Sequence, residues 1–350
     1  MLVAYASGHG FGHVTRLCEV LRAVRDRAPE LPVTVVGAVP EWLVRPRVPG
    51  RVEFRPLACD VGLAQRDALL IDECATAALC RGFEATWEAR IDAEVEFLRA
   101  CRARVVLGDI PPLAFAAAAR AGVESIALGN FTWDWIYLHL ADRQPSLAES
   151  AARAARAYEQ AGLLLELPFS GAFPAFPRRE RVGLVARRPQ VDGSEARRRL
   201  RLDARPAALV SFGGVGLPGL TREVLGRDPE LQFVLPEDVG PGLLDALGLD
   251  YPDVVGAVDV VVTKPGYGIV SDAIGARTRV VYTERGDFPE YPVMVREMPR
   301  WLACVHVGNE DLRAGRIGEP IRQVLAQPLP PPVDLGGAER AAGHILEVLG

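Results

Sequence analysis

The chain has 350 residues and a formal net charge of −5, with 49% hydrophobic and 24% charged residues. This length fits two domains of ordinary size, and the composition is that of a globular protein rather than a disordered one. The acidic balance gives no overall basic field, so nucleic acid is not expected as a partner.

Neither a membrane span nor a targeting segment is expected. The chain opens on MLVAYAS, without the charged and apolar regions of a signal peptide, and it lacks an uninterrupted run of about 18 apolar residues. The six cysteines form no CxxC pair and no zinc-type spacing with histidine. We therefore expect a cytoplasmic protein that holds no metal.

Short apolar runs alternate with segments of helical periodicity along the whole chain. In the first half, strands are predicted at 2–7, 32–38, 51–57, 103–109 and 124–130, with helices at 13–28 and 112–122 and one or two long helices within 76–101. In the second half, strands are predicted at 207–214, 231–237, 258–264, 278–284 and 302–307, with helices at 218–226, 240–247, 268–275, 292–299 and 317–326. This alternation favours parallel sheets, so the predicted fold class is α/β with two tandem Rossmann-like, doubly wound domains.

The boundary between these domains is predicted where the periodicity is lost. Residues 167–190 are rich in Pro and Arg, which is typical of a linker. We therefore expect a first domain at 1–167 and a second at 168–330, with a cleft between them. A Pro run then leads into a final amphipathic helix within 331–350, which is expected to pack back on the first domain.

The stretch SGHGFGHVTR, residues 7–16, follows the first predicted strand. Ligands of parallel sheets collect at the carboxyl ends of strands. The glycine spacing differs from the dinucleotide motif GxGxxG, and no third ligand joins His9 and His13, which disfavours a dehydrogenase and a metal site. Gly10 and Gly12 leave room for a substrate to approach. His13, at the helix start, is the candidate general base; the alternative is that both histidines only cap the helix or contact the loop.

A carboxylate that could orient His13 follows the fourth predicted strand. VVLGDIPP places Asp109 at the carboxyl end of that strand, on the same edge of the sheet. An aspartate there fixes the tautomer of a histidine and stabilises its charged form. The alternative is a helix N-cap ahead of the Pro-Pro pair.

An aromatic segment, GNFTWDWIY at 129–137, follows the next strand. Trp133 could offer a platform to a sugar or an apolar acceptor, with Asp134 as a polar group beside it. A cluster in the hydrophobic core is the alternative for these aromatic side chains.

Two glycine-rich turns of the second domain are candidates for holding a diphosphate. SFGGVG contains Gly213 and Gly214, and TKPGYGIVSDAI contains Lys264, Gly266 and Gly268 ahead of an apolar helix. Backbone amides, a helix dipole and one cation are what a diphosphate needs. Lys264 is the only lysine of the chain. An ordinary strand-to-helix turn is the alternative.

Polar side chains next to these turns could hold the sugar part of a nucleotide-sugar. Ser271 and Asp272 lie one turn into the helix and could accept hydrogen bonds from ribose hydroxyls. The loop TERGDFPEYP adds Glu284, Asp287 and Glu290, which suit sugar hydroxyls or else solvent.

Together these motifs resemble those of the two-Rossmann (GT-B) glycosyltransferases. The group that they resemble contains the peptidoglycan GlcNAc transferase, the monogalactosyl-diacylglycerol synthases and the glycosyltransferase-like N-terminal region of arabinokinases. The resemblance spans nearly the whole chain and rests on SGHGFGHVTR, the segment from GDIPPLAF to WDWIY, SFGGVG and TKPGYGIVSDAI.

This resemblance implies a role for each candidate residue. The first domain would bind the acceptor, with His13 as base and Asp109 as its partner. The second would bind a nucleotide-sugar, with Gly213 and Gly214 in the donor loop and Lys264, Gly266 and Gly268 at the diphosphate. Asp272, one methylene shorter than the glutamate of relatives, would meet the ribose, and Glu290 the donor sugar. The residues expected to contact the acceptor or the donor sugar are His9, Gly10, Gly12, Trp133 and Asp134.

The implied reaction is a metal-independent, inverting transfer of a sugar from a donor such as a UDP- or GDP-sugar, which is a co-substrate rather than a cofactor. The acceptor would be a hydroxyl of a small molecule or glycan, as in natural product biosynthesis. A nonhydrolysing sugar-nucleotide epimerase and a noncatalytic sugar-nucleotide binding module are the alternatives. The oligomeric state is left open.

Membrane association is a less favoured alternative for the location of the protein. Trp42, Leu43 and Val44 lie beside Arg45 and Arg47, a combination that suits a shallow membrane interface. A segment that packs on the first domain is the favoured interpretation.

Overall fold

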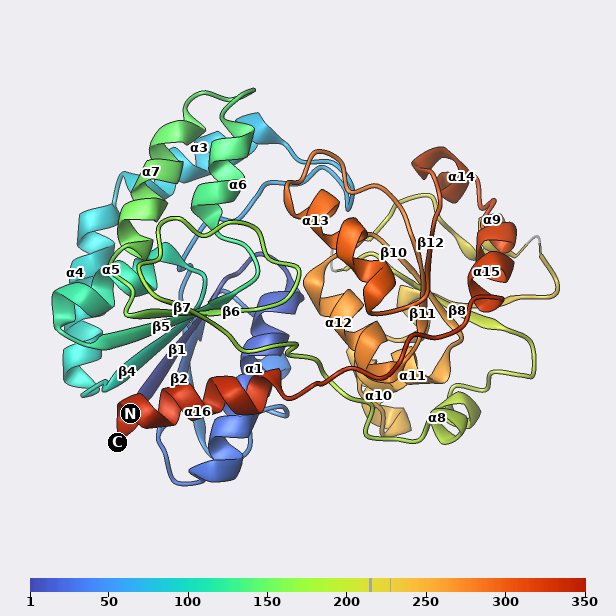
Figure 1. Ribbon diagram of the computed structural model, residues 1–350, viewed down its shortest axis with the longest axis horizontal. Helices are drawn as coiled ribbons and strands as arrows, with labels where there is room; N and C mark the ends of the chain where they lie inside the picture. Colours follow the sequence, from blue (N-terminus) through green and yellow to red (C-terminus); the bar gives the residue numbers. More distant parts are fainter. Residues whose placement is uncertain (214–215, 227) are drawn as a thin grey trace. The chain divides into compact units, whose positions relative to one another are not determined.

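The computed structural model describes residues 1–213, 216–226 and 228–350 (Figure 1). It divides into two compact units, each built on a parallel sheet of its own. Unit 1 consists of residues 1–64, 71–185 and 334–350, and unit 2 consists of 65–70 and 186–333. Gly214, a predicted donor-loop residue, lies outside the described residues.

The sheet of unit 1 has seven strands in the order β3-β2-β1-β4-β5-β6-β7, and all neighbouring strands are parallel. They are β1 (Leu2–Ala6), β2 (Val33–Gly37), β3 (Val52–Pro56), β4 (Val105–Asp109), β5 (Glu124–Gly129), β6 (Leu163–Glu166) and β7 (Arg179–Arg181). Because the chain runs outward from β1 to β3 and returns at β4, the direction of winding changes between β1 and β4. This point is the topological switch of a doubly wound sheet, where ligands bind.

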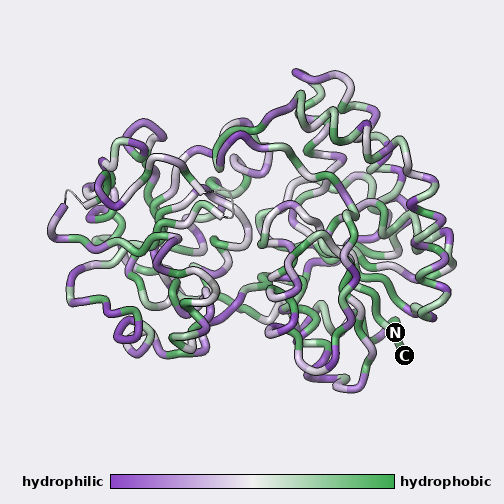
Figure 2. Tube along the Cα trace, turned by 180° about the vertical axis from the view of Figure 1, so that it is seen from behind, coloured by the Kyte–Doolittle hydropathy of each residue, from purple (hydrophilic) through white to green (hydrophobic). Residues whose placement is uncertain are grey.

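Helices flank this sheet and bury its central strands on both faces. They are α1 (Phe11–Arg27), α2 (Glu41–Val44), α3 (Glu73–Glu84), α4 (Trp87–Ala100), α5 (Pro112–Ala121), α6 (Trp133–Leu140), α7 (Leu147–Tyr158) and α16 (Gly337–Leu349). The central strands are continuous apolar runs, as strands covered on both faces must be (Figure 2). Helix α16 packs along α1 (Figure 1), and its Ala341, Ala342 and Ile345 are buried.

Unit 2 repeats the design with five parallel strands in the order β12-β11-β10-β8-β9. They are β8 (Ala207–Ser211), β9 (Gln232–Val234), β10 (Val260–Thr263), β11 (Arg279–Tyr282) and β12 (Cys304–His306). Its helices are α8 (Gly193–Arg199), α9 (Arg222–Leu225), α10 (Pro241–Leu247), α11 (Tyr251–Ala257), α12 (Tyr267–Ala276), α13 (Glu290–Glu297), α14 (Asn309–Arg313) and α15 (Gly318–Leu325), with 3-10 turns at Pro236–Asp238 and Met298–Arg300. The winding changes between β8 and β10.

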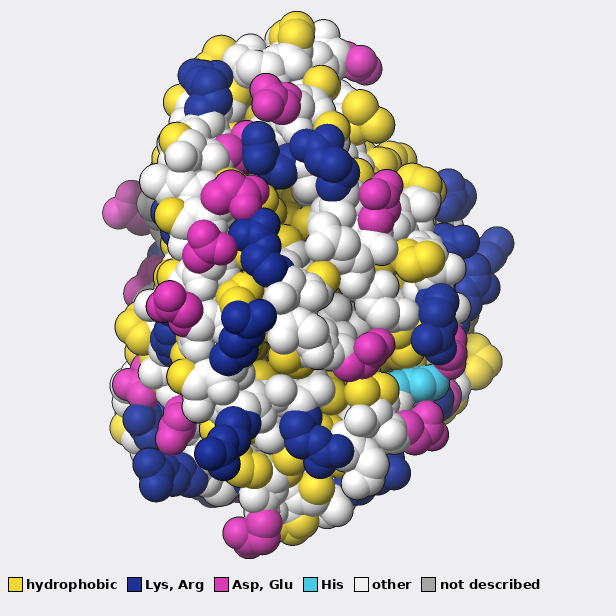
Figure 3. All heavy atoms as spheres, turned by 90° about the vertical axis from the view of Figure 1, so that its left-hand side faces the viewer, with side chains coloured by type: hydrophobic (Ala, Val, Ile, Leu, Met, Phe, Trp, Pro, Cys, Tyr) yellow, Lys and Arg dark blue, Asp and Glu magenta, His cyan; other side chains and the backbone are white. Residues whose placement is uncertain are grey.

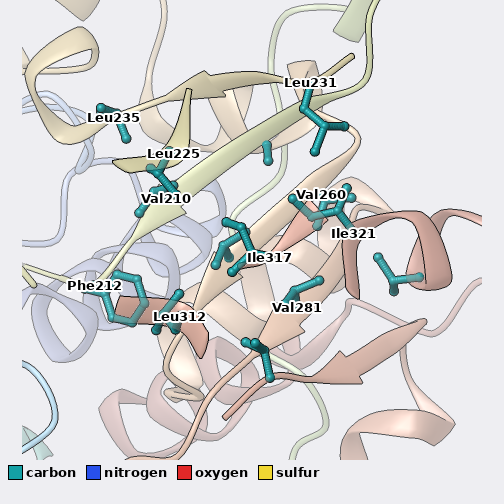
Figure 4. Close-up of a cluster of buried hydrophobic side chains, with 14 of the residues drawn as sticks. Val210, Phe212, Leu225, Leu231, Leu235, Val260, Val281, Leu312, Ile317 and Ile321 are labelled. Carbon is teal, nitrogen blue, oxygen red and sulfur yellow. The ribbon is translucent and has the colours of Figure 1, made fainter. Parts of the chain in front are cut away.

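The core of unit 2 fills one face of this sheet. Val210, Val260 and Val281 of the strands pack against Leu312 and Ile321 of the helices (Figure 4). The same cluster includes Ala68 and Leu69 of the segment 65–70, which is separated in sequence from the rest of unit 2.

The predicted α/β class with two doubly wound sheets is confirmed, whereas several boundaries differ. Unit 1 continues to Val185 rather than to residue 167, because the segment expected to be a linker contributes β7 as a parallel edge strand beside β6. Strand β6 and the helices α6 and α7 were not predicted. Unit 1 resumes at Asp334, and the segment 65–70 belongs to unit 2.

Charges on the surface are mixed. On the face shown in Figure 3, arginine and acidic side chains lie among one another. Arg120, for example, pairs with Glu88 at 2.7 Å and with Asp92 at 2.9 Å, joining α5 to α4.

Candidate functional site

The topological switch of unit 1 brings the first two predicted motifs together. The ends of β1 and β4 are neighbours, with Ala6 paired to Asp109 in register. The turn after β1 leads into α1 through Gly10, which has φ of 83° at the N-cap. That backbone conformation suits glycine alone, so the turn places His13 in the first turn of α1, facing the end of β4.

His13 and Asp109 form a buried pair. Nδ1 of His13 lies 2.7 Å from Oδ1 of Asp109, and the two residues are 7% and 0% exposed. A carboxylate at this distance accepts the proton of Nδ1, so a neutral His13 carries its lone pair on Nε2. This is the tautomer that a general base requires.

Arg16, one turn further along α1, binds the same carboxylate. Its Nε donates to Oδ2 of Asp109 at 2.5 Å and one terminal nitrogen donates to Oδ1 at 2.7 Å. Burial raises the pKa of Asp109, but the charges of Arg16 and His13 outweigh this effect and hold that pKa below its ordinary value. The carboxylate is therefore ionised at neutral pH. Arg16 lies within the SGHGFGHVTR stretch, three residues after His13, yet was not predicted as a site residue.

His9 supports the loop that follows β3. Its Nδ1 accepts a hydrogen bond from the backbone N–H of Leu63 at 3.2 Å, and its ring meets Trp133 edge-on at 5.4 Å. Gly62 leaves the space for this ring, since a Cβ on Gly62 would lie 2.6 Å from Cβ of His9. The structure thus gives His9 a loop-holding contact, while its predicted contact with donor or acceptor stays a prediction.

Trp133 is 0% exposed and packs in an aromatic cluster, as the alternative interpretation expects, while its predicted contact with a sugar or an acceptor stays a prediction. Its ring stacks on the ring of Tyr137, with the two ring centroids 5.7 Å apart. Its Nε1 donates a hydrogen bond to Oδ2 of Asp60 at 2.8 Å. Asp60 also accepts from the backbone N–H of Gly8 at 3.3 Å. The sequence analysis did not predict Asp60 as a site residue because it stands in a loop without periodicity. The indole of Trp133 holds this carboxylate in place beside His13.

Asp134, in the first turn of α6, is a buried carboxyl. Within the part of the chain that the structure describes, its Oδ1 has no hydrogen-bond partner. Burial raises the pKa of Asp134. A buried oxygen without a partner can bind a hydroxyl of a ligand.

Gly12 lies half-buried in the first turn of α1, beside His13.

The switch point of unit 2 brings together the predicted donor turns. Thr263 at the end of β10 is in register with Ser211 at the end of β8, and its hydroxyl donates to the carbonyl of Ser211 at 2.5 Å. Gly213 follows β8 with φ of 71° and is exposed. Lys264 follows β10, and Gly266 is the N-cap of α12. This arrangement joins a helix N-terminus to a cation, as an anion site requires.

Lys264 is a half-buried cation whose Nζ donates to the carbonyl of Ala68 at 2.5 Å. Burial and the neighbouring charge of Arg285 lower the pKa of Lys264 to about 7. Arg285 donates to the carbonyl of Pro265 at 3.2 Å, so a second cation lies at the same turn. Arg285 stands within the TERGDFPEYP loop but was not predicted, because only the carboxylates of that loop were considered.

The remaining donor candidates are buried and already bonded within unit 2. Asp272 is 2% exposed and forms an ion pair with Arg187, whose Nε lies 3.1 Å from Oδ1. The carboxylate thus faces Arg187, and the predicted ribose contact of Asp272 stays a prediction. Glu290 is likewise buried and paired with Arg285.

Ser271 and Gly268 bond to one another inside α12. The hydroxyl of Ser271 donates to the carbonyl of Gly268 at 2.9 Å, and Ser271 is buried. Gly268 itself is half-buried. The hydroxyl thus donates to a backbone carbonyl of its own helix, and its predicted contact with the donor stays a prediction.

Among the described residues, no group of three or more His, Cys, Asp or Glu side chains is arranged to hold a metal ion. In the same part of the chain, no helix combines the length and apolar character of a membrane span. Leu43 and Val44 are buried in unit 1, whereas Trp42, at 47%, and Arg45 are exposed.

Each unit contains a doubly wound parallel sheet, and two such Rossmann-like domains in one chain are the GT-B fold. Solved structures with that fold align over nearly the whole chain. A glycosyltransferase of kitacinnamycin has a TM-score of 0.60 at 18% identity, covering 99% of this chain and 94% of that one. A UDP-glucosyltransferase from Polygonum tinctorium has a TM-score of 0.60 at 13% identity, covering 99% and 98%. The calicheamicin glycosyltransferase CalG4 has a TM-score of 0.55 at 16% identity, covering 100% and 95%. At these identities the likeness shows the fold.

By sequence, the chain is similar to L-arabinokinase of Arabidopsis thaliana, with 31% identity over 329 residues. The match covers 89% of this chain but only 31% of the arabinokinase, so the chain spans about a third of that relative. No family model matches the sequence.

Proposed function

We propose that the protein is a glycosyltransferase that moves a sugar from a nucleotide diphosphate donor to a hydroxyl of a small-molecule or glycan acceptor. Unit 1 would bind the acceptor and unit 2 the donor. Support comes from the fold, since similar structures include UDP-glucosyltransferases, and from the anion-binding character of the turn at Lys264.

The single observation that carries this proposal is the buried contact of 2.7 Å between His13 and Asp109 at the switch point of unit 1. A histidine whose Nδ1 is held by a carboxylate leaves Nε2 to take a proton. Helix capping would not require the ring to lie on a buried, ionised aspartate.

The proposed reaction is a single displacement at the anomeric carbon. Nε2 of His13 takes the proton of the acceptor hydroxyl while that oxygen forms a bond to C1 of the donor sugar. The bond from C1 to the diphosphate oxygen breaks, and the nucleoside diphosphate leaves with the electron pair. One displacement inverts the anomeric configuration. Lys264, Arg285 and the N-terminus of α12 would stabilise the departing charge without a metal.

Residues near His13 would contribute to acceptor binding. The unpartnered Oδ1 of Asp134 suits a hydroxyl of the acceptor, and Gly10 and Gly12 leave the backbone turn accessible. Gly213 and Gly266 would have the corresponding role at the diphosphate.

The first test is donor binding, followed by transfer. A panel of UDP- and GDP-sugars is screened by thermal shift, because a ligand that binds the folded state raises the melting temperature. A donor that binds is then incubated with acceptor hydroxyl compounds, and product is followed by mass spectrometry. His13→Ala should lower kcat by about 100- to 10,000-fold. The control is His344→Ala, a half-buried histidine of α16 that pairs with Glu180.

Two other outcomes would replace this proposal. Conversion of a nucleotide-sugar to its epimer without any acceptor would identify an epimerase. Donor binding with no turnover, unchanged in His13→Ala, would identify a binding module, a role compatible with the similarity to a sugar kinase. Full activity in His13→Ala would remove the assigned base.

A further inference from the structure

Arg16 is a third member of the His13–Asp109 pair. It stands on α1 one turn after His13, and it is 4% exposed. It reaches both oxygens of Asp109, at 2.5 and 2.7 Å, and a further nitrogen donates to Oδ1 of Asn130 at 2.7 Å. The guanidinium therefore bridges the ends of β4 and β5.

A buried aspartate with only a neutral histidine beside it would be an uncompensated charge. Taking such a carboxylate out of water costs several kcal/mol, so it would tend to bind a proton instead. A protonated Asp109 could no longer accept from Nδ1 of His13 with its full charge. The two hydrogen bonds from Arg16 keep Asp109 ionised and fix the plane of its carboxylate.

We infer that Arg16 is a positioning residue for the proposed base: it holds Asp109 in the orientation that keeps the proton of neutral His13 on Nδ1 and the lone pair on Nε2. The inference rests on the proposed function for its kinetic consequences. Its structural content, the tautomer of His13, is independent of any substrate.

Two contacts of Nδ1 of His13 show which group the ring nitrogen bonds to. A terminal nitrogen of Arg16 lies 3.3 Å from Nδ1 of His13, whereas Oδ1 of Asp109 lies at 2.7 Å. Nδ1 cannot both donate to the carboxylate and accept from the guanidinium. The shorter, charge-assisted contact decides for donation, so Arg16 acts on His13 through Asp109.

A dependence on pH follows from the charges around Asp109. The charged and titratable groups around Asp109 are His13 and Arg16 of α1 and the neutral phenol of Tyr158 of α7, while Asp60 faces His13 from the loop after β3. Arg16 and His13 lower the pKa of Asp109, and burial opposes them. Without Arg16, burial would raise that pKa. The acidic limb of the rate profile would then move to higher pH, because His13 loses its charged partner sooner as pH falls.

The test compares Arg16→Gln and Arg16→Lys in the full chain with Arg22→Gln as the matched control. Arg22 lies on the same helix but is more exposed and pairs with Glu19. In Arg16→Gln, kcat is expected to fall by about 10- to 100-fold, with KM for the donor unchanged and the acidic limb shifted upward. Arg16→Lys keeps the positive charge but loses the two-point contact of the guanidinium with Asp109. It should therefore have the pH profile of the parent protein, with a kcat between those of the parent protein and Arg16→Gln. Arg22→Gln should behave as the parent protein.

A spectroscopic measurement keeps the inference testable without turnover. In ¹⁵N-labelled protein, the ring nitrogens of neutral His13 should report Nδ1–H in the parent protein and a mixture of tautomers in Arg16→Gln. If Arg16→Gln does not fold, Arg16→Lys is used, and parental kcat together with an unchanged tautomer in that variant overturns the inference. An unshifted acidic limb in a folded Arg16→Gln also overturns it.

Failure of the proposed function has a different signature. If no donor supports transfer, or if His13→Ala remains fully active, the assignment of the base is wrong. The tautomer comparison then still decides whether Arg16 positions the ring.

Discussion

The indole Nε1 of Trp133 donates a hydrogen bond of 2.8 Å to Oδ2 of Asp60, joining the first turn of α6 to the loop after β3. Oδ1 of the same carboxylate accepts from the backbone N–H of Gly8. Asp60 therefore connects two segments that surround His13. Burial raises the pKa of Asp60, and hydrogen bonds from Ser7 and Trp133 oppose the increase.

Replacing Asp60 by Ala should destabilise unit 1. The change leaves the indole N–H of the buried Trp133 without its acceptor, which costs about 1–3 kcal/mol, and it also removes the hydrogen bonds from the exposed backbone N–H of Gly8 and from Ser7. Urea denaturation measures the loss. Asp60→Asn keeps one acceptor oxygen and should lose less. Equal stability of Asp60→Ala and the parent protein would show that the hydrogen bonds to Asp60 contribute nothing.

A methyl group at position 62 should displace His9. Gly62 has φ of 67°, and a Cβ there would lie 2.7 Å from Nδ1 of His9. Gly62→Ala therefore combines backbone strain with a clash and should cost about 1–3 kcal/mol. The matched control is Gly82→Ala in α3, where a Cβ meets nothing within 4 Å. That control should gain about 0.5–1 kcal/mol, so opposite signs are expected in thermal unfolding.

The sequence predicted the parts of the site that depend on strand ends. Periodicity places a turn after β1 and a carboxylate at the end of β4, and a parallel sheet brings these two ends together. His13 and Asp109 meet for that reason. Side-chain partners across helices leave no such pattern. The partner of Asp272 is Arg187, 85 positions away in the sequence, and nothing in TKPGYGIVSDAI indicates it.

Short segments without periodicity were the other source of error. Residues 65–70 form a loop in sequence terms, yet Ala68 and Leu69 pack into the core of unit 2. Strand β7 is Arg-Glu-Arg, an exposed edge strand that lacks the apolar run of an inner strand. Both are placed by tertiary contacts rather than by local preference.

The stability of unit 2 should depend on pH through Lys264. Its pKa is lowered to about 7 in the folded protein, against 10.5 for an ordinary lysine. Between these values the unfolded chain binds more protons, so stability rises with pH across that window. Lys264→Met removes this dependence. The difference in free energy of unfolding between the parent protein and Lys264→Met should change by up to about 1.4 kcal/mol per pH unit.

The measurement of this dependence is urea denaturation of both proteins at several pH values from 6.5 to about 9. Groups common to the two proteins cancel in the difference. Parallel curves would mean that Lys264 keeps an ordinary pKa, which would contradict its burial against Ala68 and beside Arg285.

Removing Arg187 should destabilise unit 2 in a way that depends on pH. The carboxylate of Asp272 is 2% exposed, and burial raises its pKa while Arg187 opposes the increase. Arg187→Met leaves the buried carboxylate without its charged partner at neutral pH, with the backbone N–H of residue 187 as its remaining hydrogen-bond donor from that position, and this loss costs about 3–5 kcal/mol. As pH falls, Asp272 in this variant can bind a proton within the folded protein, so the loss should shrink toward pH 5. Arg188→Met, at an exposed neighbour, is the control. A loss that stays constant between pH 8 and about 5 would show that Arg187 acts through packing alone.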